Sequence, residues 1–142
     1  MSKGTVDVFF YGLFMDKALL GSKSIRPSRE TTGYVDGYGL RIGRRATLVR
    51  ESGHRTYGVL MTIGRDEATS LYADATVADY VAEPVSVTLP NGIVEPAVCY
   101  NLPPNALEGS NAVYAQRLLV LATKLGFPED YLDRIRAQGH TT

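Results

Sequence analysis

The stretch Val8-Phe9-Phe10-Tyr11-Gly12-Leu13-Phe14-Met15-Asp16 decides the fold that the sequence predicts. Its first residues are β-branched or aromatic, which is typical of a strand covered on both faces. Gly12 interrupts this run, and glycine lets a chain direct its amide groups into a cavity, where they can hold a carboxylate. Asp16 can cap a short helix that ends before Gly21. We therefore expect a buried strand followed by a loop that forms one wall of a small-molecule pocket.

Further strands are predicted downstream of this loop, over residues 33–42, 46–49, 57–63, 81–89 and 95–101. Glu51-Ser52-Gly53-His54 has the composition of a turn, so the segments before and after it are expected to form an antiparallel hairpin. Pro90-Asn91-Gly92 predicts a second hairpin, because an Asn-Gly pair accepts the positive φ angles of a tight turn.

Helices are predicted over residues 66–72, 112–125 and 129–137. Ser110 or Asn111 can cap the second of these helices, and Gly126 can end it. Strands in series followed by helices predict an α+β fold. We expect a small mixed or antiparallel, barrel-like sheet flanked by helices, with residues 1–142 forming one domain.

The composition excludes several classes of function. The chain has 142 residues with 15 Lys+Arg and 15 Asp+Glu, and a neutral protein lacks the basic excess of a nucleic-acid surface. No apolar run is long enough to span a bilayer, and no secretory signal precedes the first strand, so a cytoplasmic protein without a membrane partner is expected. Cys99 is the single cysteine, and no Cys/His cluster suggests a metal; we expect no metal, no cofactor, and a monomer or homodimer.

Several short motifs, taken in order, resemble the γ-glutamylcyclotransferase-like family, including its AIG2-like branch. The Tyr11-Gly12 pair matches the Tyr-Gly that ends the family's first strand and opens its binding loop. Gly37-Tyr38-Gly39-Leu40 and Tyr57-Gly58-Val59-Leu60 look like later strands, and the stretch from Leu125 to Tyr131 is similar to a late Leu-Gly-Leu-Pro-x-x-Tyr motif. The resemblance covers most of the chain and implies the family's fold, whereas activity does not follow from fold.

The resemblance also implies a chemistry, from which this sequence departs. In the family, a glutamate in Leu-Asp-x-x-Glu-Gly takes a proton from the substrate's α-amine, which attacks the γ-carbonyl and releases 5-oxoproline. Here the segment reads Leu71-Tyr72-Ala73-Asp74-Ala75-Thr76, so Ala75 stands where the family has glutamate. Loss of a proton-transfer group typically costs about 10²–10⁴-fold in rate. Asp74, one position earlier, is the candidate displaced carboxylate, with Asp79 as a second choice.

The predicted binding residues are Tyr11, Gly12, Leu13, Phe14, Ala75 and Tyr80, the last of which matches a tyrosine that follows the family's glutamate segment. Each has a plainer reading: a turn, the core, or a half-buried strand tyrosine. Arg45 belongs to a basic cluster that can attract an anion or simply face solvent. Cys99 lies in an apolar strand with no histidine nearby in sequence, which indicates an inert thiol.

Two functions of different classes remain open. The first is a γ-glutamylcyclotransferase-like protein that binds a small γ-glutamyl or amino-acid-like ligand, with or without 5-oxoproline formation at Asp74. The second is a non-catalytic module on the same fold that binds a small carboxylate or another protein.

Overall fold

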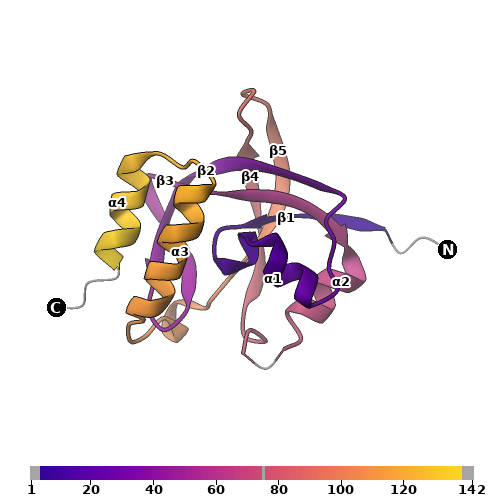
Figure 1. The fold of residues 1–142 in the computed structure, drawn as a ribbon, viewed down its shortest axis with the longest axis horizontal. Coiled ribbons are helices and arrows are strands. Elements are labelled where there is room, and N and C mark those ends of the chain that lie inside the picture. Colours follow the sequence, from indigo (N-terminus) through magenta and orange to yellow (C-terminus); the bar gives the residue numbers. More distant parts are fainter. Residues whose placement is uncertain (1–3, 75, 139–142) are drawn as a thin grey trace.

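A computed structural model describes residues 4–74 and 76–138 (Figure 1). The strands in this part of the chain are β1 (Thr5–Phe10), β2 (Arg29–Ile42), β3 (Ala46–Gly64), β4 (Val81–Thr88) and β5 (Val94–Asn101). The helices are α1 (Lys17–Ser22), α2 (Arg65–Leu71), α3 (Ala112–Lys124) and α4 (Glu129–Gln138), together with the 3₁₀ turns η1 (Leu13–Met15) and η2 (Pro104–Ala106).

The strands form a closed barrel in the order β1-β3-β2-β4-β5. β1 runs antiparallel to β3, from the pair Thr5–Gly64 to the pair Phe10–Val59. β1 meets β5 in parallel at Val8 and Val98, so the last residues of both strands lie at the same end of the barrel. Figure 1 shows α3 and α4 together on one side, and α1 and α2 on the other. The predicted α+β fold with a barrel-like sheet flanked by helices is confirmed.

The hairpin predicted from residues 46–49 and 57–63 is wrong, because both segments belong to the single long strand β3. β3 pairs with β2, and the register jumps from Asp36–Arg55 to Tyr38–Arg50. Residues 51–54 are therefore accommodated opposite Gly37, as a bulge rather than a turn between strands. The reversal of direction comes earlier, at residues 43–45 between β2 and β3.

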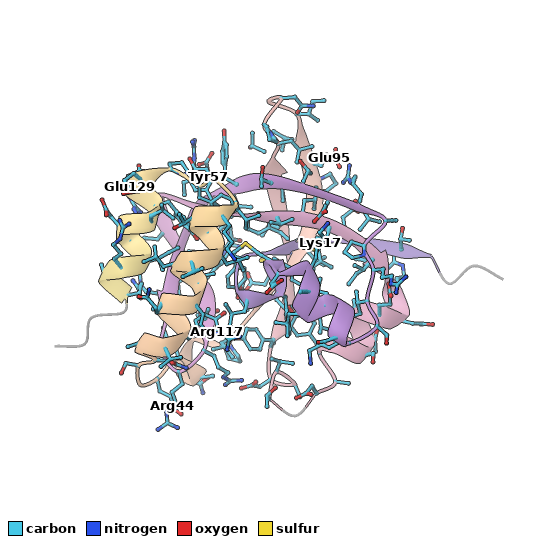
Figure 2. All side chains as sticks on the ribbon, viewed as in Figure 1. Lys17, Arg44, Tyr57, Glu95, Arg117 and Glu129 are labelled. Carbon is cyan, nitrogen blue, oxygen red and sulfur yellow. The ribbon has the colours of Figure 1, made fainter. Side chains whose placement is uncertain are left out.

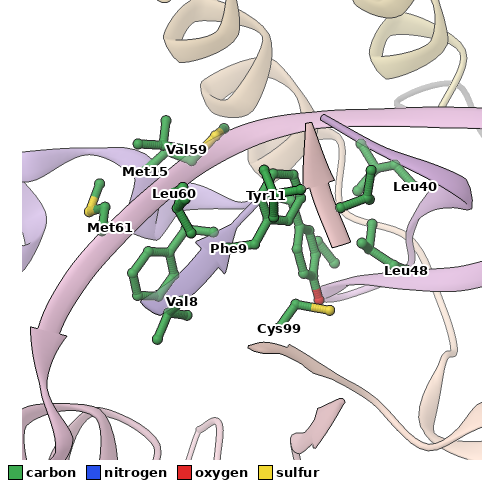
Figure 3. Close-up of a cluster of buried hydrophobic side chains, with 14 of the residues drawn as sticks. Val8, Phe9, Tyr11, Met15, Leu40, Leu48, Val59, Leu60, Met61 and Cys99 are labelled. Atoms are coloured by element: carbon green, nitrogen blue, oxygen red, sulfur yellow. The ribbon is translucent and has the colours of Figure 1, made fainter. Parts of the chain in front are cut away.

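The core fills the barrel and continues under the helices. Val8, Phe9 and Phe10 of β1 are all buried, as the continuous apolar run predicts. Figure 3 shows Phe9 and Tyr11 among buried side chains from other strands, including Leu60 and Cys99. This packing fixes the end of β1, from which the Gly12 loop departs.

α3 and α4 cover the barrel beside Tyr57 of β3. The ring of Tyr57 lies 5.7 Å from that of Phe127 and 5.2 Å from that of Tyr131, and Figure 2 shows Tyr57 on the side of the barrel that carries these helices. Asn111 caps α3 by accepting a hydrogen bond from the backbone amide of Tyr114, and its own amide group donates to the carbonyl of Arg44. This second bond ties the start of α3 to the turn between β2 and β3. Gly126 follows the helix with a φ of 79°, as the sequence predicts.

Within the described residues, no helix is both long and apolar enough to cross a membrane.

Candidate functional site

A cavity of about 200 Å³ lies at the end of the barrel where β1 and β5 finish. The Gly12 loop forms one wall, because it leaves β1 directly above this end. The other walls come from α1, the start of β3, the segment between α2 and β4, the end of β5 and the first turn of α3. The residues that line the cavity are Phe9, Phe10, Tyr11, Gly12, Leu13, Phe14, Leu19, Arg45, Ala46, Tyr72, Val77, Tyr80, Tyr100 and Tyr114.

Five of the predicted binding residues, Tyr11, Gly12, Leu13, Phe14 and Tyr80, thus meet at one cavity. The sixth, Ala75, lies outside the described residues. Neither Asp74 nor Asp79 is among the described residues that line the cavity.

Tyr11 joins the ends of two neighbouring strands. It is buried, and its hydroxyl donates to the main-chain carbonyl of Tyr100 at 2.6 Å. Burial raises the pKa of this phenol well above its usual value, and neighbouring tyrosines add to the effect. Tyr11 is therefore a neutral anchor that fixes β1 against β5, where the loop begins.

Tyr114 of α3 reaches into the Gly12 loop. Its hydroxyl accepts a hydrogen bond from the backbone amide of Leu13 at 3.3 Å. A side chain at Gly12 would collide with the same hydroxyl oxygen. Burial raises the pKa of Tyr114 to about 12, so the group stays protonated. One of the loop amides predicted to face a ligand is therefore already paired with a side chain of the protein.

Aromatic rings form the opposite wall. The rings of Tyr72 and Tyr100 are stacked, with centroids 3.8 Å apart and planes 13° from parallel. Phe14 meets Tyr72 edge-on at 6.0 Å, and Tyr80 lies 6.0 Å from Tyr72. The hydroxyl of Tyr80 donates to the carbonyl of Ala46 at 2.6 Å, and burial raises its pKa. These contacts give the cavity a largely apolar surface with fixed rings.

Arg45 is the charged residue among the described lining residues. Its guanidinium makes a bidentate pair with Asp79, at 2.6 and 2.8 Å, and also donates to the carbonyl of Thr76 at 3.0 Å. The hydrogen bonds from Arg45 lower the pKa of Asp79. Asp79 is therefore ionised at physiological pH, and Arg45 binds its carboxylate at the cavity wall.

Asp74 is exposed, and its carboxylate faces its own turn. One oxygen accepts from the backbone amide of Thr76 at 2.9 Å and from the Thr76 hydroxyl at 2.7 Å. The backbone bond is the main cause of a lowered pKa. A carboxylate held in its ionised form in this way is a weak proton acceptor. Its predicted catalytic role stays a prediction.

Cys99 is completely buried, and burial raises the pKa of its thiol to about 12. Such a thiol is not a nucleophile at neutral pH. Among residues 4–74 and 76–138, no group of three or more His, Cys, Asp or Glu side chains could hold a metal ion.

Tyr72, Tyr100 and Tyr114 line the cavity but are not among the binding residues that the sequence predicts. Tyr72 lies in the segment whose sequence resembles the family's glutamate motif, so its position could have been a signal. Tyr100 ends β5, and the parallel pairing of β5 with β1 that brings it to Tyr11 is not visible in the sequence. Tyr114 lies 101 residues from its partner Leu13.

No family model and no curated protein matches the sequence. Solved structures do match the fold. A γ-glutamyl cyclotransferase superimposes with a TM-score of 0.76 at 18% identity, over 94% of this chain and 88% of that one. A yeast γ-glutamyl cyclotransferase specific to glutathione gives 0.61 at 14% identity, over 96% and 97% of the two chains.

An AIG2-like protein from Mus musculus gives a TM-score of 0.59 at 14% identity, over 77% of this chain and 90% of that one. Identities this low establish a shared fold and leave activity to be tested. The chain therefore has the γ-glutamyl cyclotransferase-like fold.

Proposed function

We propose that this chain binds a small γ-glutamyl or amino-acid-like ligand in the cavity beside the Gly12 loop. The observation that carries the proposal is the cavity itself, about 200 Å³ in volume and bordered by the loop from Tyr11 to Phe14. The fold supports it, because one structure with this fold is described as a γ-glutamyl cyclotransferase specific to glutathione.

The proposal does not include release of 5-oxoproline. That reaction needs a base near the substrate amine, and the described residues that line the cavity include no carboxylate. The tyrosine hydroxyls there are poor bases, because burial keeps Tyr11 and Tyr72 protonated by raising each pKa well above its usual value. The resemblance of the segment from Leu71 to Thr76 to the family's motif implies that Ala75 stands at the position of the glutamate.

Arg45 offers a place for the carboxylate of the ligand. A guanidinium binds carboxylates through paired hydrogen bonds, and Arg45 already makes such a pair with Asp79. A ligand carboxylate at the cavity mouth would share or replace this partner. A simple carboxylate could use the same contact, which keeps open the alternative of a general carboxylate-binding module.

Calorimetric titration tests the proposal directly. We expect γ-glutamyl dipeptides to bind the native protein, and Val77→Trp to abolish binding because Val77 lines the cavity. Val113→Trp is the matched control, since Val113 is 70% exposed on α3 and is not among the described residues that line the cavity. Absence of binding to the native protein would refute the proposal. Acetate binding as tightly as the dipeptides would favour the general carboxylate module.

The chemistry is tested by measuring 5-oxoproline release from the same dipeptides. We expect none above background from the native protein. If release is found, turnover by Asp74→Asn tests whether Asp74 acts as the proton-transfer group in place of a glutamate. Unchanged turnover in this variant would exclude Asp74 from the mechanism. An Ala75→Glu variant that gains activity would support a site that has lost its proton-transfer group.

A further inference from the structure

We infer that the cavity selects ligands with a hydrophobic group beside a carbonyl or amide oxygen, and that Tyr114 donates the hydrogen bond to that oxygen. This inference rests on the proposed function and specifies which γ-glutamyl compounds bind: those whose second residue is aromatic or bulky and apolar. Hydrophilic γ-glutamyl peptides such as glutathione are expected to bind weakly.

Several polar groups at the cavity are already engaged by other parts of the protein. The hydroxyls of Tyr11 and Tyr80 already donate to main-chain carbonyls. The guanidinium of Arg45 is engaged by Asp79 and the Thr76 carbonyl. A polar ligand group placed beside these three engaged groups would lose water without gaining a partner, which is unfavourable.

Tyr114 differs from Tyr11 and Tyr80, because its hydroxyl accepts a hydrogen bond instead of donating one to a carbonyl. Its oxygen accepts from the Leu13 amide, and the described residues provide no acceptor for its own hydrogen. A hydroxyl has one hydrogen to donate in addition to its acceptor capacity. Because Tyr114 lines the cavity, it can donate to one oxygen of a ligand. The bond from Leu13 fixes the position of the hydroxyl before the ligand arrives.

The apolar wall of the cavity consists of aromatic rings. The stacked pair of Tyr72 and Tyr100, with Phe14 set edge-on to Tyr72, presents flat ring surfaces and edges. Aromatic side groups pack favourably in offset or edge-on contact with such rings. Burial of a benzyl-sized group is expected to raise affinity by about tenfold or more.

The experiment compares γ-glutamyl-phenylalanine, γ-glutamyl-glycine and glutathione by calorimetric titration of the native protein. We expect the phenylalanine compound to bind at least about tenfold more tightly than the other two. Equal affinities, or tightest binding of glutathione, would overturn the inference while leaving the proposed function intact.

A second pair of probes separates the two proposals further: 3-phenylpropanoate and propanoate, which lack a γ-glutamyl group. If no γ-glutamyl compound binds but phenylpropanoate binds more tightly than propanoate, the proposed function fails and the apolar selectivity stands. If none of the five compounds binds, both are refuted.

Two variants assign the roles. Tyr72→Ala should remove most of the preference for the phenylalanine compound over the glycine compound. Tyr114→Phe should weaken both by a similar factor, about fivefold, because each loses the same hydrogen bond. Unaltered affinities in Tyr114→Phe, with the melting temperature confirming a folded protein, would exclude Tyr114 as the donor.

Discussion

The hydroxyl of Tyr114 occupies the space that a side chain on Gly12 would need. Gly12 has an ordinary φ of −110°, so glycine is required here for room rather than for its backbone conformation. The contact joins the first turn of α3 to the loop after β1. It thereby connects the two walls of the cavity that are farthest apart in the sequence.

Gly12→Ala should therefore destabilise the protein by about 1–3 kcal/mol, because the added methyl group must displace the Tyr114 hydroxyl. Tyr114→Phe removes that hydroxyl and, by itself, should cost about 1 kcal/mol through loss of the Leu13 hydrogen bond. The double variant should be destabilised by less than the sum of the two single-variant costs, because without the Tyr114 hydroxyl the added methyl group no longer collides with it. Urea denaturation of the four proteins measures the difference, and strictly additive costs would contradict this explanation.

The ion pair between Arg45 and Asp79 should make stability depend on pH in the acid range. The pKa of Asp79 is lowered in the folded protein, so its ionised form is favoured there. The ion pair stabilises the fold fully above about pH 3.9, which is the pKa of an aspartate in the unfolded chain. This stabilisation is lost as the pH falls through the lower pKa that Asp79 has in the folded protein. Asp79→Asn should lower the melting temperature at pH 7.

At a pH below the folded value, the melting temperatures of the native protein and Asp79→Asn should converge. Thermal unfolding followed across this range checks the prediction. A gap between the two proteins that stays constant down to low pH would show that the carboxylate charge is not the cause.

Cys99 should resist thiol reagents in the folded protein. It is fully buried, and its pKa is raised to about 12, so almost no thiolate exists at pH 8. We expect no reaction with 5,5′-dithiobis(2-nitrobenzoate) under native conditions and reaction of one thiol per chain after unfolding in urea. Rapid labelling of the native protein would mean that this part of β5 opens readily.

The sequence predicts the barrel well where one local pattern decides the outcome. The apolar run that ends at Tyr11 marks a strand covered on both faces, and Val8, Phe9 and Phe10 are indeed buried. The prediction fails at residues 51–54, where a local turn signal competes with a long pairing. Gly53 does adopt a φ of 82°, as in a turn, but β3 continues because β2 pairs with it on both sides of the bulge.

The candidate site is predictable only in part, for a related reason. Residues of the Gly12 loop could be identified because they are contiguous in the sequence. The aromatic wall could not, because it forms when chain segments far apart are brought together by barrel closure. Tyr11 and Tyr100, 89 residues apart, are joined by a single hydrogen bond between neighbouring parallel strands.

The cap of α3 offers a last test, because the sequence left Ser110 and Asn111 as equal candidates. The structure chooses Asn111, whose carbonyl oxygen accepts from the Tyr114 amide at 2.9 Å while its amide nitrogen donates to Arg44 at 3.1 Å. Asn111→Ala should cost about 1–2 kcal/mol in the free energy of unfolding. Ser110→Ala is the matched control and should cost less than about 0.5 kcal/mol, as is usual for an exposed side chain without such a role. Asn111 also fixes the helix turn that carries Tyr114, so its loss should weaken ligand binding as well. If urea denaturation shows a larger effect for Ser110→Ala than for Asn111→Ala, Asn111 is not the residue that caps α3.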